Sequence, residues 1–585
     1  MKGWLAGLAA GLLLFGCTPT AEESVQPSLY PAGEYHGTAM GYQGELEVSV
    51  LLTDSHIDEI RVPVCPETTG IGAVVVEQLP GLIVANQTLQ VDVVAGATVT
   101  SRALLDAVQQ AVESSGADLT PLLEEPEEPV SPSLQAQVTE ADLVIVGAGG
   151  AGLTAAAAAA QVNPDLDIVL LEKTGAVGGD TLRAEDGVNA AGTSVQQQTG
   201  VEDGFERMLF DTLAVSGGEE AEPLEVLVGD SSSAIEWLAG LGIPLDALRQ
   251  LDGSTVERTH FPSDGTPIGQ ALVDGLADAV QQAGVTLCLN TQATGLVTDA
   301  QGRICGVIAE SPGVRHYYTG RAVILATGGF AANDRLCGSY RTLLRGLDTV
   351  SGDAAQGEGI TIAQALGAAT VDMQQVLLEP TVHRGSAQIV PRSLREAGAI
   401  LVSREGEPLE ADPLNDAALS EELLAQSGRC GWMIFGEGLL HLLPETLQPY
   451  LVSGEDPAAL AQSAGLPVEA LEAVVETRNA ELPETADETG NERYPARLEG
   501  TLYALEVAPG IQSTLGGLEI TADAEVIGAD GNPIPGLYAA GEVAGGIHGE
   551  QVLPGNMLTD LLVFGRRAGQ NAAILLSQGE NGDDV

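Results

Sequence analysis

Hydrophobic and polar residues alternate in two stretches near the N-terminus, residues 45–52 (Glu-Leu-Glu-Val-Ser-Val-Leu-Leu) and residues 56–62 (His-Ile-Asp-Glu-Ile-Arg-Val). A period of two is typical of half-buried β-strands. Residues 73–83 and 102–112 instead show the apolar spacing of amphipathic helices. Together these elements predict a small α+β module over residues 30–116.

A second and longer region starts at Ala141, where the chain becomes apolar and rich in glycine. Residues 117–140 separate the two regions and contain the run Leu-Glu-Glu-Pro-Glu-Glu-Pro-Val-Ser-Pro. Proline and mutually repelling carboxylates keep such a segment extended, and it cannot bury a core. We therefore predict a linker at residues 117–140.

The N-terminus has the pattern of an export signal. Met1 and Lys2 precede an apolar run at residues 4–15, which is short for a bilayer span and has the form of a signal-peptide core. The run ends in Leu-Phe-Gly-Cys17, which resembles a bacterial lipobox. That resemblance implies a signal peptide at residues 1–17, a lipid anchor on Cys17, a tether at residues 18–29 and an extracytoplasmic location on the bacterial cell membrane. An ordinary signal peptide with a chance cysteine is the alternative.

The charge of the chain and the spacing of its cysteines and histidines limit which partners and metals we expect it to bind. The chain carries 82 acidic and 24 basic residues, a formal net charge of -58. Such a surface repels nucleic acid, so we expect no nucleic-acid partner. The six cysteines and seven histidines show no metal-ligand spacing. We expect no metal.

Residues 141–152 predict a dinucleotide site. They read Ala-Asp-Leu-Val-Ile-Val-Gly-Ala-Gly-Gly-Ala-Gly, a buried strand that runs into a glycine-rich turn and an alanine-rich helix. Gly147 allows the tight turn, Gly149 lets backbone approach a pyrophosphate, and Gly152 lets the helix pack on the strand. The next strand ends in Glu172, the acidic residue expected on a ribose hydroxyl.

Three separated motifs resemble the FAD-binding segments of the flavoprotein subunits of fumarate reductase and succinate dehydrogenase. They are Lys-Thr-Gly-Ala-Val-Gly-Gly-Asp-Thr at 173–181, Val-Ile-Leu-Ala-Thr-Gly-Gly-Phe at 323–330 and Gly-Leu-Tyr-Ala-Ala-Gly-Glu-Val at 536–543. The resemblance implies a Rossmann-like α/β FAD-binding domain at residues 141–373 and 513–585, with an inserted α+β capping domain at residues 374–512. It implies non-covalent FAD held by Gly147, Gly149, Gly152, Glu172, Lys173, Gly178, Gly179, Asp180, Thr181, Ala326, Thr327, Gly328, Gly541 and Glu542.

A second flavin motif lies in the N-terminal module. The sequence Val-Asp-Val-Val-Ala-Gly-Ala-Thr at 91–98 resembles the attachment motif of FMN-binding domains. In that family a flavin transferase esterifies the threonine with the FMN phosphate, which implies covalent FMN on Thr98. The alternative is that Thr98, Thr100 or Ser101 simply caps a helix that starts near Arg102.

The resemblance fails at the substrate positions. The family's cationic positions are occupied here by Glu379, by Asn415 and Asp416, by Ser513 and by Val552. A carboxylate without cationic partners is costly to bury, so the sequence argues against fumarate as the substrate. Arg395 is the one recognition residue that still matches the family. Asp416 could serve as the proton donor if burial kept it protonated.

The leading functional hypothesis is a flavin reductase that transfers hydride from FAD to the activated C=C bond of an enone or enoate. The substrate would be a small-molecule electron acceptor, and a membrane or extracellular donor would supply electrons through FMN. Two alternatives stay open: a flavin-dependent dehydrogenase acting on a steroid-like or acyl substrate, and a non-catalytic electron-carrier lipoprotein. Reoxidation of the reduced flavin by alkenes distinguishes an enzyme from a carrier.

Overall fold

The computed structural model describes residues 29–41, 44–64, 71–94, 97–124, 126, 130, 135–217, 221–299, 301–482 and 496–579. The chain divides into two compact units. The first comprises residues 1–67 and 74–132, and the second comprises residues 68–73 and 133–585. Cys17, the predicted signal peptide and most of the predicted tether lie outside the described residues.

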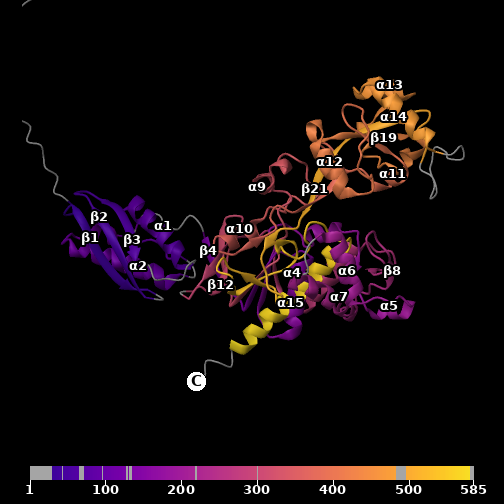
Figure 1. The fold of residues 1–585 in the computed structure, drawn as a ribbon. Helices are drawn as coiled ribbons and strands as arrows, with labels where there is room; N and C mark the ends of the chain where they lie inside the picture. The colour runs from indigo at the N-terminus through magenta and orange to yellow at the C-terminus, as the bar shows by residue number, and fades with distance from the viewer. Residues whose placement is uncertain are drawn as a thin grey trace, which may run out of the picture. The chain divides into compact units, whose positions relative to one another are not determined.

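The first unit is a three-stranded antiparallel sheet with two helices beside it (Figure 1). The strands are β1 (Gly33–Met40), β2 (Glu45–Leu52) and β3 (Ile57–Val64), and the helices are α1 (Ile71–Asn86) and α2 (Thr98–Ser114). Helix α2 crosses β1 closely, because a Cβ on Gly37 would lie 2.0 Å from the carbonyl oxygen of Ala107. This is the helix predicted at residues 102–112, and in the structure it starts earlier, at Thr98.

The second unit is built on a six-stranded sheet in the order β10-β6-β5-β14-β24-β23. Its strands are β5 (Leu143–Val146), β6 (Ile168–Leu171), β10 (Thr286–Cys288), β14 (Ala322–Leu325), β24 (Pro533–Ala539) and β23 (Glu525–Ile527). All neighbours are parallel except β23 and β24. The parallel strands β5, β6 and β14 are buried throughout, which explains their continuous apolar runs.

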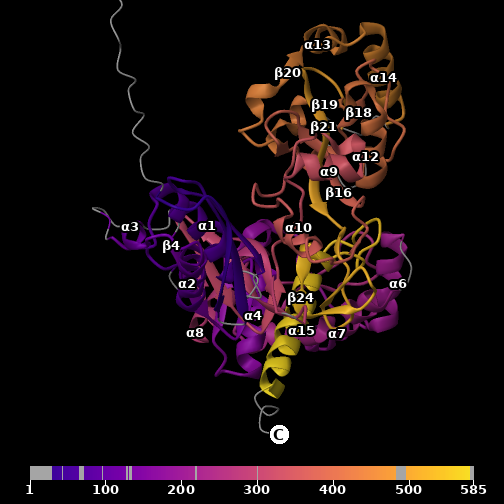
Figure 2. The same ribbon diagram turned by 90° about the vertical axis from the view of Figure 1, so that its left-hand side faces the viewer.

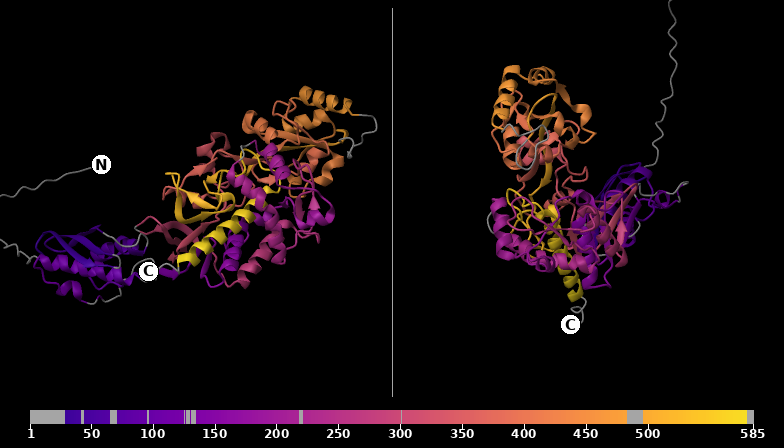
Figure 3. Two further views of the ribbon diagram at one scale, coloured as in Figure 1. Left: turned by 60° about the horizontal axis from the view of Figure 1, so that its bottom comes forward. Right: turned by 90° about the vertical axis from the view of Figure 1, so that its right-hand side faces the viewer.

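Two long helices pack together against this sheet, α4 (Gly150–Val162) and α15 (Asn556–Gly579), the long yellow helix of Figure 3. Their backbones approach closely. A Cβ on Gly569 would lie 2.2 Å from the carbonyl oxygen of Ala155, and a Cβ on Gly565 would lie 2.8 Å from that of Ala151. The alanine-rich sequence of α4 is thus the small-residue surface that this helix pair requires.

A four-stranded sheet extends the second unit in the order β11-β12-β13-β4. It consists of β11 (Gln292–Thr298), β12 (Ile304–Ser311), β13 (Val314–Thr319) and β4 (Gln135–Glu140). Strand β4 pairs in parallel with β13 and lies within the segment predicted as a linker, which also contains α3 (Thr120–Leu123). The extended part of that segment is therefore shorter than predicted.

Smaller elements surround these sheets. Strands β7 (Val188–Asn189), β9 (Thr259–Phe261) and β8 (Ala247–Arg249) form one short sheet, and β15 (Thr370–Val371) pairs with β22 (Gly517–Leu518). The helices are α5 (Ser194–Thr199), α6 (Phe205–Ser216), α7 (Glu222–Gly240), α8 (Ile268–Gln282), α9 (Asp334–Tyr340) and α10 (Glu358–Gln364). No helix among the described residues combines the length and apolar character needed to cross a bilayer.

Residues between β15 and β22 form the α+β part of the second unit, shown in orange in Figure 2. Its sheet has the order β17-β16-β21-β19-β18, with β20 beside β21. The strands are β16 (Val376–His383), β17 (Gln388–Ile389), β18 (Ile400–Val402), β19 (Gly431–Gly436), β20 (Val452–Gly454) and β21 (Leu502–Thr514). The helices are α11 (Arg392–Glu396), α12 (Asp416–Ala425), α13 (Pro457–Ala464) and α14 (Val468–Ala480).

Candidate functional site

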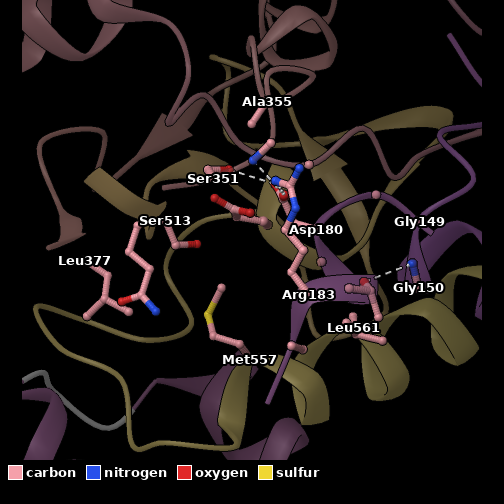
Figure 4. Close-up of a pocket in the computed structure, with 18 of the residues that line it drawn as sticks. Gly149, Gly150, Asp180, Arg183, Ser351, Ala355, Leu377, Ser513, Met557 and Leu561 are labelled. Carbon is pink, nitrogen blue, oxygen red and sulfur yellow. Dashed lines mark hydrogen bonds and ion pairs between the residues drawn. The ribbon is translucent and has the colours of Figure 1, made fainter. Parts of the chain in front are cut away.

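A single large cavity of about 1960 Å³ brings the predicted flavin and substrate positions together. Of the fourteen predicted FAD positions, twelve line it: Gly147, Gly149, Glu172, Lys173, Gly179, Asp180, Thr181, Ala326, Thr327, Gly328, Gly541 and Glu542. Gly152 and Gly178 are not among its lining residues. Figure 4 shows Gly149 and Gly150 on one side of the view and Leu377, Ser513 and Met557 on the other, with Asp180 between them.

The glycines of the first turn have two different roles. Gly147 has φ +103°, and a Cβ there would lie 2.2 Å from the carbonyl oxygen of Ala326. A Cβ on Gly152 would lie 1.8 Å from the carbonyl oxygen of Gly147, so Gly152 serves the packing of α4 on the strand. At Gly149 the nearest atom to such a Cβ is 3.8 Å away. Gly149 therefore leaves space that a ligand can use.

Glu172 and Lys173 lie where β6 ends. Glu172 accepts hydrogen bonds from the backbone N–H of Ala148 at 2.9 Å and from that of Thr174 at 2.8 Å. These bonds hold the carboxylate beside the glycine turn, where a ribose hydroxyl is expected. The Lys173 ammonium forms an ion pair with Glu358 at 2.5 Å. The sequence did not identify Glu358, which belongs to α10, as a neighbour of this position.

Asp180 and Thr181 fasten a second turn to the cavity wall. The Thr181 hydroxyl accepts from the backbone N–H of Gly150 at 3.1 Å, at the start of α4. Asp180 accepts from the Ser351 hydroxyl and from the backbone N–H of Gly352, each at 2.7 Å. The two bonds of Asp180, drawn dashed in Figure 4, join segments about 170 residues apart, and no local pattern identifies residues 351–352.

Glu542 is a half-buried residue of the cavity lining. It accepts hydrogen bonds from the backbone N–H of Thr514 at 2.8 Å and from its hydroxyl at 3.0 Å. Burial is the largest influence and raises the pKa of the Glu542 carboxyl, although the bonds from Thr514 oppose it. A Cβ on Gly329 would lie 2.0 Å from the Thr514 hydroxyl and 2.3 Å from this carboxylate, which explains the glycine at 329.

These residues fit FAD. Three glycines form a cradle with open space where side chains would otherwise stand: the nearest atoms to a Cβ lie at 3.8 Å for Gly149 and 3.7 Å for Gly179, and none lies within 4 Å for Gly328. Gly149 is the N-cap of α4 and supplies no side-chain cap. The first N–H groups of this helix and its dipole therefore favour a diphosphate.

The α+β part contributes the other end of the cavity. Glu379 of β16, Asn415 before α12 and Asp416 all line it, as do Ser513 and Val552. Each position at which the sequence departs from the family's cations therefore faces the cavity. Apolar lining comes from Leu377, Leu378, Ile389, Leu414 and Met557. This end combines apolar side chains with carboxyl and amide groups.

The structure does not support Asp416 as the proton donor. Its Oδ1 accepts from Nη1 of Arg395 at 2.6 Å, and its Oδ2 accepts from Nη1 of Arg392 at 2.8 Å. Both oxygens are engaged by guanidinium groups, so neither is available to carry a transferable proton. The N-terminal cap of α12 is Asn415, whose side chain accepts from the backbone N–H of Ala418 at 3.1 Å.

Arg395 does not line the cavity. Its side chain is 0% exposed, because α11 packs it behind Asp416, where Nη1 also donates to the carbonyl oxygen of Pro413 at 2.5 Å. Because this lining contains no Arg395 side chain, the role of Arg395 in binding substrate stays a prediction. Arg395 positions the two carboxyl groups on either side of it, Asp416 and Glu379, the second at 3.7 Å.

Thr98 is the first residue of α2, which has Ala97 as its N-cap and no side-chain cap. The capping alternative for Thr98 therefore does not hold. Thr98 is half-buried, whereas Thr100 is 3% exposed and Ser101 is 0% exposed. The Ser101 hydroxyl accepts from the backbone N–H of Val94 at 3.1 Å. Of the three hydroxyls, that of Thr98 is the most accessible to a flavin phosphate.

Comparison with known proteins assigns both parts of the chain. Residues 142–558 match the FAD binding domain family, and residues 41–113 match the FMN-binding domain family. The chain thus carries an FAD-binding domain and a small FMN-binding domain, and the predicted fold class is confirmed.

The similarity extends over nearly the whole chain. Urocanate reductase of Eggerthella lenta is 34% identical over 98% of this chain and 98% of its own length. The NADH:fumarate oxidoreductase of Klebsiella pneumoniae is 31% identical over 94% of this chain, which spans 59% of that protein. Among solved structures, the open conformation of a flavocytochrome c3 fumarate reductase is 31% identical with a TM-score of 0.67, covering 75% of this chain and 78% of that one.

Proposed function

Because the chain belongs to the FAD-binding-domain family of fumarate and urocanate reductases, we propose that it reduces the activated C=C bond of an enone or enoate other than fumarate. The chain is an FAD-dependent oxidoreductase that acts on C=C bonds. Bound FAD supplies the hydride for this reaction. The choice of substrate within this class rests on the charges of the cavity.

One observation carries the proposal against fumarate. Each basic side chain in the described lining of the cavity is already ion-paired: Lys173 with Glu358 at 2.5 Å, Arg183 with Asp180 at 3.1 Å, and Arg392 with Asp416 at 2.8 Å and with Asp252 at 2.7 Å. A dicarboxylate needs paired donors at both ends. Without them its desolvation costs several kcal/mol, so a substrate with one carbonyl or carboxylate end fits better.

The remaining lining agrees with such a substrate. Leu377, Leu414, Val552 and Met557 present apolar surface to the body of the molecule. Carboxyl groups outnumber basic groups among the described lining residues, so a second anionic end would be repelled in a poorly screened site. The neutral side chains of Gln512, Ser513 and Gln551 offer hydrogen bonds to a carbonyl oxygen.

For the first unit we propose a covalent FMN on Thr98, attached by a flavin transferase. The accessible Thr98 hydroxyl at the start of α2 supports this assignment, because the free N–H groups and dipole of a helix N-terminus favour a phosphate. The FMN would relay electrons from a membrane or extracellular donor to FAD. The lipobox-like end of the apolar run supports an extracytoplasmic protein anchored through Cys17.

Anaerobic stopped-flow mixing tests the reaction. Dithionite-reduced protein is mixed with a panel of enones, enoates and imidazole acrylates, with fumarate included. We expect at least one panel member to reoxidise the flavin, with a kcat/KM for fumarate far below that of true fumarate reductases. Reoxidation by dyes and redox proteins alone would instead identify an electron carrier. Efficient fumarate turnover would require arginines outside the described lining, such as Arg384 or Arg258, to bind it.

Intact-mass analysis tests the FMN linkage. Protein co-expressed with a flavin transferase should show one FMN-sized adduct, which Thr98→Ala abolishes. Thr100→Ala is the matched control and should keep the adduct, because the Thr100 side chain is buried. Loss of the adduct in Thr100→Ala alone would assign the other hydroxyl.

A further inference from the structure

Reduction of an activated alkene needs a proton as well as a hydride. The hydride arrives at one carbon of the double bond, and the neighbouring carbon, next to the carbonyl group, must gain a proton. Asp416 cannot supply it, because Arg392 and Arg395 engage both of its oxygens. Basic side chains of the described lining are ion-paired. The donor must therefore be another group that faces the cavity.

Glu379 has the geometry of such a donor. It lies on β16 and lines the cavity, with its side chain 15% exposed. Its Oε1 accepts from the backbone N–H of Thr381 at 3.2 Å and from the Thr381 hydroxyl at 3.1 Å. Its Oε2 accepts no hydrogen bond from any residue that the structure describes. One oxygen thus holds the carboxyl group in place, and the other is left for a ligand.

The surroundings of Glu379 favour a protonated carboxyl group. Burial is the largest influence and raises the pKa of Glu379, against the opposing effects of Thr381 and Arg395. The charged groups that face it are Arg395 of α11 and Asp416 of α12, and the residue opposite it on β21, Gly510, has no side chain. Glu379 therefore keeps its proton to a higher pH than an ordinary glutamate does.

We propose that Glu379 is the catalytic acid of this enzyme and protonates the α-carbon of the bound alkene. The proposal rests on the proposed reductase function. As hydride reaches the β-carbon, the O–H bond at Oε2 breaks and a C–H bond forms with the electron pair of the former double bond. The alkene gains two electrons and the reduced flavin loses two. Glu379 is left as a carboxylate.

The neighbours of Glu379 favour both the release of its proton to the alkene and its later reprotonation. The guanidinium group of Arg395, 3.7 Å from Oε1, stabilises the carboxylate that forms when the proton leaves. Arg395 is itself held by Asp416 at 2.6 Å, so it stays in place. Because the Glu379 side chain is partly exposed in the cavity, water can return the proton after the product has left. Arg395 is a positioning residue in this scheme.

Single-turnover kinetics of Glu379→Gln test the proposal. Glutamine keeps the shape and the hydrogen bonds from Thr381 but cannot donate a carboxyl proton. We expect reoxidation of the reduced flavin by the alkene to slow about 100-fold or more, with reoxidation by a dye such as ferricyanide unchanged. Glu405→Gln is the matched control, because Glu405 is exposed on the same α+β part and does not line the cavity.

Two further readouts do not depend on that variant's turnover. Infrared spectra recorded across a pH titration of the oxidised protein should contain a protonated carboxyl component that persists to a higher pH than that of an ordinary glutamate and is missing from Glu379→Gln. Glu379→Asp should recover part of the alkene reaction. In the wild-type protein that reaction should slow as the pH rises through the pKa of Glu379, and in Glu379→Gln this dependence should disappear.

The outcomes separate the two proposals. Alkene reduction by Glu379→Gln at a rate close to that of the wild type, or protonated-carboxyl spectra identical in the two proteins at every pH, would overturn the role of Glu379 alone. Failure of every alkene to reoxidise the wild-type protein would overturn the reductase function itself. Slow alkene reduction with normal dye reoxidation and a lost carboxyl band supports both.

Discussion

At the scale of single residues, glycines of one sequence motif have different structural roles. Gly149 keeps a space open for a ligand, with 3.8 Å to the nearest atom from a Cβ, whereas Gly152 removes a clash of 1.8 Å with backbone. At the predicted substrate positions, too, the role of a residue depends on its neighbours. Glu379 and Asp416 are both carboxyl groups that line one cavity, but only Glu379 has an oxygen free of guanidinium groups.

Gly149→Val should abolish FAD binding without unfolding the protein. The added side chain has room within the protein and occupies the position where backbone meets the pyrophosphate. Flavin absorbance after gel filtration and mass analysis should show that FAD is lost and the FMN adduct stays. Gly152→Ala is the contrasting variant. It should lower the free energy of unfolding by about 1–3 kcal/mol, because its Cβ overlaps the Gly147 carbonyl oxygen. Full FAD occupancy in Gly149→Val would contradict the placement of the cofactor.

His260 should lower the free energy of unfolding of the protein at acidic pH. Its side chain is buried beside the Thr193 hydroxyl at 2.9 Å and the Arg258 carbonyl oxygen at 2.8 Å, and burial is the main reason that its pKa falls from 6.5 to about 4. Between these values the unfolded chain binds a proton that the folded chain does not. Stability is therefore lost as the pH falls from 6.5 to 4, by about 3 kcal/mol.

Urea unfolding at several pH values measures this effect of His260. His260→Asn keeps a donor for the Arg258 carbonyl oxygen and should flatten the pH dependence. His36→Asn is the control, because the His36 side chain is 59% exposed. An equally steep dependence in wild type and His260→Asn would assign the acid sensitivity to other groups.

At the scale of elements, buried and exposed charges connect the helices of the α+β part. Arg395 of α11 is 0% exposed and joins α11 to α12 through Asp416 and to β16 through Glu379. Arg392, one turn earlier on α11, is 33% exposed and reaches Asp416 and Asp252. Removing one partner of a buried pair leaves an uncompensated charge, whereas exposed pairs contribute little.

Arg395→Met should therefore destabilise the protein more than Arg392→Met. We expect a loss of about 3 kcal/mol for Arg395→Met, because the Asp416 carboxylate loses its buried cationic partner. Arg392→Met should cost at most about 1 kcal/mol. Chemical unfolding followed by far-UV circular dichroism compares the two. Equal losses in the free energy of unfolding would show that the burial of Arg395 does not make it more important for stability than Arg392.

At the scale of the whole molecule, the two units have separate flavin positions. Thr98 belongs to the first unit, and the FAD cavity belongs entirely to the second. The proposed electron transfer from FMN to FAD would therefore join parts that are distant in sequence. The net charge of -58 disfavours binding to anionic surfaces, so the proposed attachment to a membrane would depend on the lipid on Cys17.

Cys17→Ala should release the protein from the membrane or block its processing. Two or more acyl chains on one cysteine give stable anchoring without a spanning helix. Fractionation of cells that produce the wild type and the variant, followed by immunoblotting, measures the shift from the membrane to the soluble fraction or the medium. Unchanged membrane association of Cys17→Ala would leave Cys17 without a role in anchoring.

The sequence by itself determined the features that are local along the chain. A strand, a glycine turn and a helix that bind a diphosphate follow one another within residues 143–162, so their order and spacing can be read directly. The attachment motif that ends at Thr98 is contiguous in the same way. The three FAD segments can be read from the sequence for the same reason, because each is itself a short local motif.

Only the tertiary structure decided which groups face one another. The local pattern predicts a linker at residues 135–140, which pair instead as β4 with β13, a strand about 180 residues later. Whether Arg395 reaches the cavity depends on how α11 packs against α12 and β16, which no local spacing records. That packing buries Arg395, engages both oxygens of Asp416 and leaves Glu379 to face the cavity. Charged side chains pair with the groups that lie nearest to them in space. The local sequence pattern does not show which residues of distant segments become neighbours.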